Sequence, residues 1–450
     1  MTNRSTLLSR NSLLITALVF GLVSGCALLP PAKTDLSTTS QKILSSPSSN
    51  AVPIGRSSFK KKTAASQIRS VILLIGDGMG FEHINAASLY AHGAEGQLFM
   101  QTAPYQHAMS TANVEDAVTD SAAAATAMAT GQQVENRMLS MDSTGEPLET
   151  SLEFFQRRCK STGLVASSYL NHATPAAFAA HRQDREMLKQ IAADIYQQTK
   201  PNVLLGGTAE GITSAMATQS GYTVVKNRAE LLDVPNSVPY LSGQFSNGNM
   251  GYEYEHALDI KPYYSLQPHL SEMATKAVEI LDHDPDGFFL MIEGSRIDHA
   301  SHTNSLPHVI FEVLEFDKTV QRVVEWAAGR SDVMVIATAD HETGGMYELE
   351  GGEKGVFPTV SWATGQHTSS QVPIFGWNVN HPEQNSNVSS TFVYRLTTNG
   401  FEAPSTECVD ELKASQNTAG ASLDVRSDLQ ADSGVGTHNL HLPIILSAEN

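Results

Sequence analysis

Cysteine, basic side chains and long apolar runs are all scarce in this chain of 450 residues. It has three cysteines, and its 29 Lys and Arg residues face 47 Asp and Glu residues, giving a formal net charge of −18. Proteins that bind nucleic acid carry basic patches, so this acidity argues against nucleic acid as a specific partner. The same acidity would repel an anionic ligand unless a local positive source, such as metal ions, attracted it. The 16 His residues could supply ligands for such ions.

The apolar run near the start of the chain is too short to span a membrane as a mature helix. This run, L-L-I-T-A-L-V-F-G-L at 13–22, follows Arg4 and Arg10 and leads into V-S-G-C at 23–26. A charged beginning, a short apolar centre and a small-residue cleavage site are typical of an export signal. We therefore expect residues 1–25 to be a signal peptide that takes no part in the fold.

The sequence V-S-G-C resembles the lipobox of bacterial lipoproteins, in which the cysteine is lipidated and becomes the new N-terminus. The resemblance implies that Cys26 carries a lipid that anchors the exported protein to a membrane, and a plain secretory signal is the alternative. If the Gram-negative sorting pattern applies, Ala27 in place of Asp favours the outer membrane, on its periplasmic side or at the cell surface.

Cys159 and Cys408 are the two cysteines that remain once Cys26 is set aside. An exported protein meets an oxidising environment, so these two could form one disulfide bond. Their separation along the chain says nothing about their distance in space, so a pair of free or buried thiols is equally compatible with the sequence.

Composition divides the chain into a tether, a large domain and a tail. Residues 26–65 are rich in Ser, Thr, Pro, Ala and Lys without periodicity, which predicts a flexible tether. Over residues 66–405, short apolar runs alternate with amphipathic helical patterns such as 270–281 and 308–327. This alternation predicts an α/β domain with a central, mostly parallel sheet and helices on both faces. Hydrophobicity thins over 406–450, where we expect a loosely ordered tail.

Ionisable and hydroxyl side chains follow four of the predicted buried strands. The strands are V-I-L-L-I (71–75), L-V-A-S-S-Y (164–169), N-V-L-L-G (202–206), F-F-L-M-I (288–292) and V-M-V-I-A-T (333–338). Asp77 follows the first, His172 and Thr174 the second, Glu293, Asp298 and His302 the fourth, and Asp340 and His341 the fifth. In open α/β sheets, ligands bind at the carboxyl ends of the strands. We therefore expect these side chains to share one edge of the sheet.

Each of these residues alone has an ordinary structural explanation. Asp77 could be a turn residue beside Gly, and Asp298 with His302 could form a solvated helix pair. Asp340 and His341 could cap a helix, and His367, in G-Q-H-T, could be a surface or core histidine. Together, however, they would gather like charges at one sheet edge, and metal ions relieve that repulsion.

The types of the candidate ligands indicate which metals they suit. Mixed Asp and His ligands suit zinc with a position left open for substrate, whereas Glu, Asp and a Thr hydroxyl suit magnesium. Two zinc ions near each other can hold the attacking and leaving oxygens of an in-line displacement. The residues therefore favour phosphoryl transfer.

From about residue 68 to 380, the chain resembles bacterial and animal alkaline phosphatases in six ordered segments. These are G-D-G-M-G, T-D-S-A-A-A-A-T-A-M-A-T-G, H-A-T-P-A, F-F-L-M-I-E-G-S-R-I-D-H, T-A-D-H-E-T-G-G, and G-Q-H-T followed by V-P. The resemblance implies an enzyme that hydrolyses phosphate monoesters through a phosphoserine, with two zinc ions and one magnesium ion per chain. It also implies a role in scavenging phosphate outside the cytoplasm.

The resemblance implies three metal sites. One zinc would be held by Asp298, His302 and His367, the second by Asp77, Asp340 and His341, and magnesium by Asp77, Thr174 and Glu293. His172 and His299 stand near the magnesium position, where another branch of the family has Asp and Lys. Imidazole is a poorer partner for magnesium than carboxylate, so we expect weak magnesium retention and activity that responds to added magnesium.

The resemblance also implies the residues that meet the phosphate. Ser121 would be the nucleophile, at a helix N-terminus whose free N–H groups and positive dipole end face the phosphate. Arg185 would bind phosphate, since a planar guanidinium suits two oxygens at once. The alternatives are a surface salt bridge for Arg185 and a phosphate role for Arg182, three residues earlier. We expect Asp120 to orient Arg185 or another cation and not to bind metal.

One segment departs from the family pattern. Only 26 positions separate His341 from His367, where family members carry a longer crown insertion near a dimer interface. This short crown leaves both a homodimer and a monomer open. The alternative functions are a phosphodiesterase or sulfatase of the same superfamily, and a non-catalytic lipoprotein that binds metal or phosphate.

Overall fold

A computed structural model of the chain describes residues 67–260, 264–379, 388–402, 404 and 408. The expected signal peptide (1–25), the lipidation site Cys26, the tether (26–65) and all of the tail (406–450) except Cys408 lie outside the described residues. No helix in the described ranges is long and apolar enough to cross a membrane.

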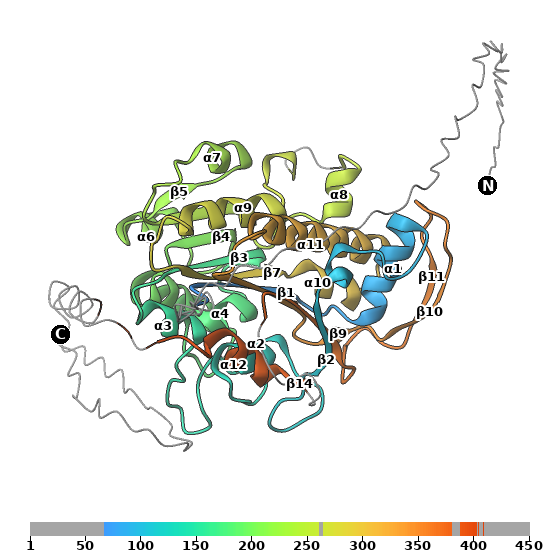
Figure 1. The fold of residues 1–450 in the computed structure, drawn as a ribbon, viewed down its shortest axis with the longest axis horizontal. Coiled ribbons are helices and arrows are strands. Elements are labelled where there is room, and N and C mark those ends of the chain that lie inside the picture. Colours follow the sequence, from blue (N-terminus) through green and yellow to red (C-terminus); the bar gives the residue numbers. More distant parts are fainter. Residues whose placement is uncertain (1–66, 261–263, 380–387, 403, 405–407, 409–450) are drawn as a thin grey trace, which may run out of the picture. The chain divides into compact units, whose positions relative to one another are not determined.

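A ten-stranded sheet runs through the middle of the domain (Figure 1). In spatial order its strands are β14 (Val388–Ser389), β2 (Tyr105–Ser110), β13 (Val372–Trp377), β8 (Val333–Thr338), β1 (Ser70–Gly76), β7 (Phe288–Gly294), β3 (Ser161–Tyr169), β4 (Val203–Thr208), β6 (Leu241–Asn247) and β5 (Thr223–Val225). β13 runs antiparallel to β2 and β8, and the other neighbours pair in parallel. The expected mostly parallel α/β sheet is confirmed.

Four adjacent strands of this sheet, β8, β1, β7 and β3, precede the candidate site residues. Their register is in phase, because Ile75 of β1 lies opposite both Glu293 of β7 and Thr338 of β8. Glu293 in turn lies opposite Ala166 of β3. The segments that follow these strands therefore leave the sheet at one edge, as the sequence predicted.

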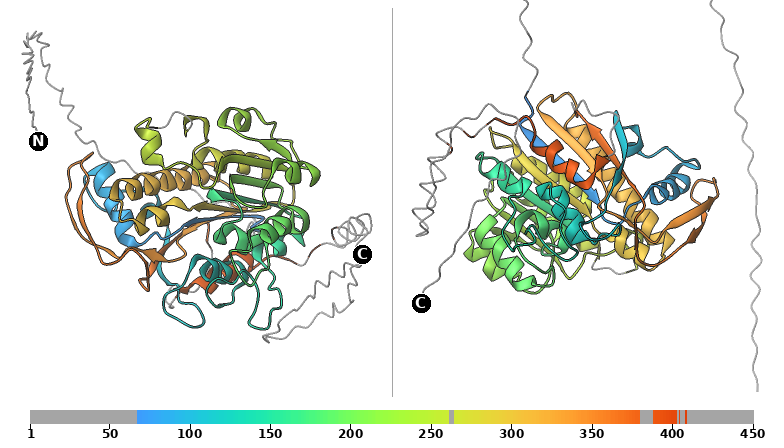
Figure 2. Two further views of the ribbon diagram at one scale, coloured as in Figure 1. Left: turned by 180° about the vertical axis from the view of Figure 1, so that it is seen from behind. Right: turned by 90° about the horizontal axis from the view of Figure 1, so that it is seen from below.

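Helices cover both faces of the sheet because its central strands are apolar on both sides, and β1, β7 and β8 are buried throughout. On one face lie α9 (Leu270–Leu281) and α11 (Leu306–Trp326), with α1 (Phe81–His92), α8 (Glu253–Ala257) and α10 (Arg296–His302) against α11. On the other lie α2 (Ser121–Thr130), α3 (Ser151–Gln156), α4 (Ala173–Ala179) and α12 (Ser390–Thr398). Figures 1 and 2 show these two layers. The remaining short helices are η1 (Phe99–Thr102), α5 (Leu188–Ala193), η2 (Asp194–Thr199), α6 (Ser214–Gln219), α7 (Arg228–Asp233) and η3 (Tyr264–Leu266).

The alanine-rich helix α2 is buried along all ten residues and packs against α4 and α12. Small side chains allow this close approach. The N-cap of α2 is Asp120, whose carboxylate accepts a hydrogen bond from the Ala123 N–H at 3.0 Å. Ser121 is therefore the first residue of the helix and not its cap, which leaves its hydroxyl available for other contacts.

Two small antiparallel sheets build the segment between His341 and His367. β9 (Glu342–Thr343) pairs with β12 (His367–Thr368), with His367 opposite Thr343. β10 (Met346–Glu350) and β11 (Thr359–Trp362) form a hairpin between them. The short segment expected in place of a longer crown is thus a hairpin, and β9–β12 brings His367 back beside the strand ends.

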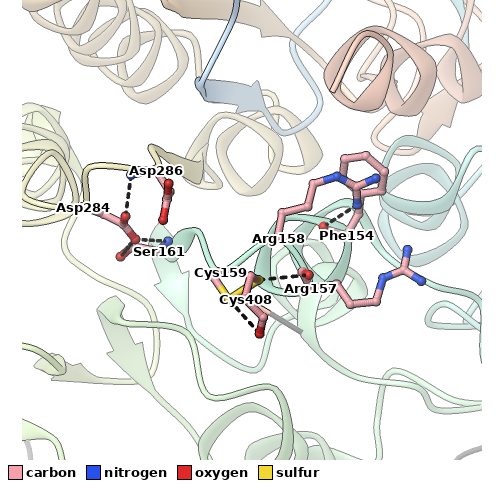
Figure 3. Close-up of a disulfide and its surroundings, with 8 residues drawn as sticks. All are labelled: Phe154, Arg157, Arg158, Cys159, Ser161, Asp284, Asp286 and Cys408. Carbon is pink, nitrogen blue, oxygen red and sulfur yellow. Dashed lines mark hydrogen bonds between the residues drawn. A yellow bond between two sulfur atoms is a disulfide. The ribbon is translucent and has the colours of Figure 1, made fainter. Parts of the chain in front are cut away.

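Cys159 and Cys408 form a disulfide bond, with 5.7 Å between their Cα atoms (Figure 3). Of the two alternatives left open by the sequence, the structure therefore has the bridge. Cys159 lies just before β3, whose first residue, Ser161, donates from its N–H and hydroxyl to Asp284 at 2.8 and 2.6 Å. The bridge thus fastens Cys408 at the end of β3 opposite the candidate site.

Candidate metal centre and active site

Three carboxylates from neighbouring strands, Asp77, Glu293 and Asp340, lie fully buried at the carboxyl edge of the sheet. We call them the strand-end acids. Burial, reinforced by the charge of Asp340, raises the pKa of Asp77 well above its usual range. Burial also raises the pKa of Glu293 to about 7 and that of Asp340 to about 6. Burial therefore makes the ionised form of these groups costly unless a cation compensates their charge.

The turn after β1 needs glycine at position 78. Gly78 has φ +73°, and a Cβ there would lie 2.8 Å from Thr343 Oγ1 and 2.9 Å from Asp298 Cα. The Gly78 N–H donates to Asp340 Oδ1 at 3.0 Å. The glycine therefore lets the turn that carries Asp77 pack directly against α10 and β9.

Asp77, Asp340 and His341 form an inner pocket in which all three side chains are completely buried. His341 Nε2 lies 3.5 Å from Asp77 Oδ1 and 3.2 Å from Asp340 Oδ2. Burial lowers the pKa of His341 well below its usual value, so the ring is neutral and its Nε2 can offer a lone pair. This set matches the second zinc site that the resemblance implies.

Asp298, His302 and His367 form an outer pocket, with two residues on α10 and one on β12. The Nε2 atoms of His302 and His367 lie 3.2 Å apart, and they lie 3.3 and 3.5 Å from carboxylate oxygens of Asp298. His302 Nδ1 donates to the Gly365 carbonyl at 2.8 Å, and His367 Nδ1 donates to the Thr119 carbonyl at 2.9 Å. Because Nδ1 carries the donated proton in each ring, both Nε2 atoms are turned inward.

The outer pocket holds protons when no cation is present. The hydrogen bond between His302 and Asp298 raises the pKa of His302 to about 9. Although burial opposes the change, hydrogen bonds from His302 and His367 lower the pKa of Asp298 well below its usual range. A metal ion would take the place of the proton between them.

A third group adjoins the inner pocket. Asp77, Glu293 and His172 have ligand atoms within 4.8 Å of one another, and Thr174 lies buried two residues after His172. The sequence placed His172 beside this site, and the geometry brings it to ligand distance. His299 lies further out, with its ring centroid 5.6 Å from that of His172. Burial lowers the pKa of His172 well below its usual value and that of His299 to about 4, so both imidazoles are neutral.

Buried polar atoms indicate that these pockets fit cations. Asp77 Oδ1 and Oδ2, Asp340 Oδ2, Glu293 Oε1 and Thr174 Oγ1 have no hydrogen-bond partner in the part of the chain that the structure describes. Buried oxygens without partners are costly unless an ion or water occupies the space between them. The donor set therefore fits zinc in the two Asp–His pockets and a harder, oxygen-preferring ion beside Glu293 and Thr174.

Ser121 and Arg185 face this metal centre from the helical layer. Ser121 is 3% exposed, and its Oγ lies 3.2 Å from His341 Nε2. Arg185 donates to Asp120 Oδ2 and to His172 Nε2, each at 3.2 Å. Asp120 thus orients Arg185, as expected. Arg182, the alternative arginine, pairs instead with Asp194 at 2.5 Å.

A second acidic group lies away from the strand ends, at α8, α9 and α11. We call Glu253, His269, Glu312 and Glu315 the helix cluster; three of its members, Glu253, His269 and Glu315, have ligand atoms close enough to hold a metal. Protein donors already occupy the Glu315 oxygens, because the Ser271 N–H donates to one at 2.9 Å and Lys318 to the other at 2.8 Å. His269 donates to Glu253 at 2.8 Å. We assign no metal to this cluster.

Thr343 is a further residue of the candidate site, which was not predicted from the sequence. Its hydroxyl donates to Asp298 Oδ1 at 2.6 Å and lies 3.3 Å from His341 Nδ1. Thr343 lies within T-A-D-H-E-T-G-G, two residues after His341. Its position two residues after His341 was the one feature of the sequence that could have indicated its role. The contact of Thr343 with Asp298 on α10 forms only in the folded chain.

The chain is similar to known proteins in sequence and in fold. The sequence model of one family, described as alkaline phosphatase, matches residues 68–359. The chain belongs to the alkaline phosphatase family. It is 34% identical over 317 residues to alkaline phosphatase 3 of Bacillus subtilis (strain 168), covering 67% of each chain. It is 32% identical over 328 residues to alkaline phosphatase of Escherichia coli (strain K12), covering 61% of this chain and 70% of that one.

Solved structures of the family share the fold. The alkaline phosphatase of the Antarctic bacterium TAB5 matches with a TM-score of 0.64 and 23% identity, over 75% of this chain and 100% of that one. The Thermus thermophilus alkaline phosphatase matches with a TM-score of 0.67 and 22% identity, over 78% and 96%. Membership in this family makes the chain a phosphomonoester hydrolase that depends on metal ions.

Proposed function

We propose that the chain hydrolyses phosphate monoesters through a phosphoserine at Ser121, with two zinc ions and one magnesium ion per chain. The observation that carries this proposal is the position of Ser121. Its hydroxyl lies at the N-terminus of α2 and 3.2 Å from the Nε2 atom of His341, a residue of the inner pocket. A serine in this position can reach a phosphorus atom held between the helix end and the pockets.

The two pockets and the third group would hold the ions as the sequence predicted. Asp298, His302 and His367 would hold one zinc, Asp77, Asp340 and His341 the other, and Asp77, Thr174 and Glu293 the magnesium, with His172 at its side. When bound, such ions supply Lewis-acid stabilisation of an attacking and a leaving oxygen. The nucleophile and the donors that bind the phosphate would come from the protein.

Ser121 Oγ would lose its proton and attack phosphorus in line while the bond from phosphorus to the ester oxygen breaks, so that the alcohol leaves with a proton. Water would then hydrolyse the phosphoserine, which restores the Ser121 hydroxyl and releases inorganic phosphate. Arg185 would bind two oxygens of the phosphoryl group through its planar guanidinium. The contacts of Arg185 with Asp120 and His172 hold that guanidinium in place before substrate arrives. The free N–H groups at the start of α2 would add donors where negative charge accumulates.

We further propose that the enzyme acts outside the cytoplasm, on a lipid anchor at Cys26, and scavenges phosphate there. The Cys159–Cys408 disulfide supports export, since disulfide bonds persist in oxidising compartments. The lipobox-like sequence at 23–26 supports the anchor. Because the overall charge of −18 disfavours anionic substrates at a distance, binding would depend on the cations at the centre.

A phosphodiesterase of the same superfamily is the second candidate. Diesterases of this superfamily commonly use Thr as nucleophile and lack the magnesium site and this arginine. The presence of Ser121, Glu293 and Arg185 around one centre favours the monoesterase.

Hydrolysis of p-nitrophenyl phosphate and bis-p-nitrophenyl phosphate by the wild type and Ser121→Ala tests the proposal. We expect the wild type to prefer the monoester, and Ser121→Ala to lose at least about 1,000-fold in kcat. Ser151→Ala is the matched control, since Ser151 is likewise the buried first residue of a helix, α3. A faster diester rate in the wild type contradicts the monoesterase. Unchanged monoester turnover in Ser121→Ala contradicts the nucleophile.

A further inference from the structure

Thr343 lies where three parts of the metal centre meet. It is fully buried on β9, two residues after His341, and it lies opposite His367 in the β9–β12 pair. Its backbone N–H donates to the Gly78 carbonyl at 3.1 Å, in the turn that carries Asp77. The backbone of Thr343 is therefore fixed relative to residues from both zinc pockets.

The side chain of Thr343 makes two polar contacts, and their chemistry sets their direction. An ionised carboxylate accepts only, so the Thr343 hydroxyl donates to Asp298 Oδ1 at 2.6 Å. With its proton committed, the hydroxyl oxygen can only accept from His341 Nδ1–H, at 3.3 Å. The chain of donors runs from His341 through Thr343 to Asp298. This direction leaves the Nε2 atom of His341 unprotonated and pointing to Asp77, Asp340 and Ser121.

We propose that Thr343 is a positioning residue that holds one ligand of each proposed zinc site at the same time. Asp298 belongs to the outer pocket and His341 to the inner pocket, and one hydroxyl joins them. Thr343 thereby couples the geometry of the two ions. This inference rests on the metal assignments of the proposed function.

The hydroxyl matters because its surroundings are buried. Without it, Asp298 Oδ1 loses its shortest hydrogen-bond donor and His341 Nδ1–H loses the acceptor that orients the ring. Outer partners of metal ligands typically contribute a factor of 10 to 100 in metal affinity. An ordinary buried threonine gives no such effect on metal binding, because its hydroxyl serves the fold alone.

Zinc binding by the full-length chain tests the inference. Zinc retention is measured per chain against buffers of fixed free zinc, for the wild type, Thr343→Val and Thr343→Ser. Val keeps the shape and removes the hydroxyl, whereas Ser keeps the hydroxyl. Thr319→Val is the matched control, because Thr319 is equally buried on α11 and donates to the Glu315 carbonyl at 2.7 Å. Thr343→Ala replaces Thr343→Val if the latter does not fold, as judged by melting of the metal-free proteins.

In Thr343→Val, we expect both zinc ions to be lost at a free zinc concentration about 10 to 100 times higher than in the wild type. Thr343→Ser and Thr319→Val should bind zinc as the wild type does. Wild-type zinc binding by Thr343→Val, equal losses in the Val and Ser variants, or weakening of one ion alone each overturn the inference. If the wild type binds zinc but does not hydrolyse phosphate monoesters, the proposed function is wrong, and the zinc binding of the variants still decides this inference. A wild type that binds no zinc overturns both.

Discussion

The strand-end acids and the helix cluster are both groups of buried carboxylates, but they are neutralised in different ways. Asp77, Glu293 and Asp340 retain buried oxygens without a hydrogen-bond partner among the described residues. In the helix cluster, Lys318 and the Ser271 N–H occupy Glu315, and His269 donates to Glu253. The first group therefore has oxygens that a cation from solution could bind, whereas donors within the protein contact the carboxylates of the second group.

This difference separates a metal centre from a structural network more clearly than the residue types do. Both groups combine carboxylates with histidine at metal-binding distances. In the helix cluster, however, each acid has a protein donor, including Glu312, which accepts the Glu253 N–H at 2.8 Å. Whether each buried carboxylate oxygen has a hydrogen-bond donor therefore distinguishes the candidate metal centre from the structural network.

The largest expected effect is the difference between two variants, each of which removes one charge from one of the two groups. Asp340→Asn keeps an oxygen that can accept the Gly78 N–H but removes the charge, so it should lower monoesterase activity at least about 100-fold and reduce bound zinc. Glu315→Gln removes a buried charge from the helix cluster and should leave zinc content unchanged. Equal zinc losses in the two variants would contradict the distinction.

Removal of the metal ions tests the whole centre. EDTA should abolish wild-type activity, and zinc with magnesium should restore it.

A smaller effect should appear in the pH dependence of stability. Burial, with the charge of Glu253, raises the pKa of Glu312 to about 8, against 4.5 in the unfolded chain. The folded state therefore holds a proton that the unfolded state releases, and stability falls as pH rises from about 4.5 through 8. Glu312→Gln keeps a neutral acceptor, so the wild type should lose on the order of 1–3 kcal/mol more than this variant.

Urea unfolding between pH 5 and 9 measures that difference in the free energy of unfolding. Glu95→Gln, at an exposed position, is the charge-matched control and should follow the wild type. Parallel pH curves for the wild type and Glu312→Gln would show that Glu312 is ionised in the fold.

The smallest effect is expected at Lys318, the cation of the helix cluster. Its side chain is 45% exposed and pairs with Glu315 three residues away on the same helix. Such pairs contribute little, so Lys318→Met should lower the free energy of unfolding by about 0.5 kcal/mol or less. A loss above about 2 kcal/mol in thermal or urea unfolding would mean that the cluster depends on this cation as the strand ends depend on metal.

The clustering of the candidate metal ligands could be predicted from the sequence because these residues follow directly after fully buried strands. Asp77, Glu293 and Asp340 each lie within two residues of a continuous apolar run, and such runs identify parallel strands well. Strands β2, β5 and β14, which lie at or next to the edges of the sheet, were not predicted, for the opposite reason. β2 alternates buried and exposed residues, and β5 and β14 have three and two residues.

Tertiary contacts account for the rest of what the sequence could not give. Thr343 has no local mark of its role, because its partner Asp298 lies 45 positions away. The Cys159–Cys408 bridge joins positions separated by 249 residues, so pairing and free thiols looked alike. The choice between Arg185 and Arg182 also depended on partners, Asp120 and Asp194, that only the fold brings near.

The in-phase register of β8, β1, β7 and β3 also has a consequence for how the protein forms. The proposed ligands are dispersed from Asp77 to His367, and those from neighbouring strands come together when distant segments have paired in parallel. Parallel pairing between remote segments is slow, because long loops must close before contacts repay the lost entropy. An ion meeting the unfolded chain would find its ligands scattered. We therefore expect metal binding to follow the pairing of the apolar strands, so that the ions would stabilise a sheet that is already formed.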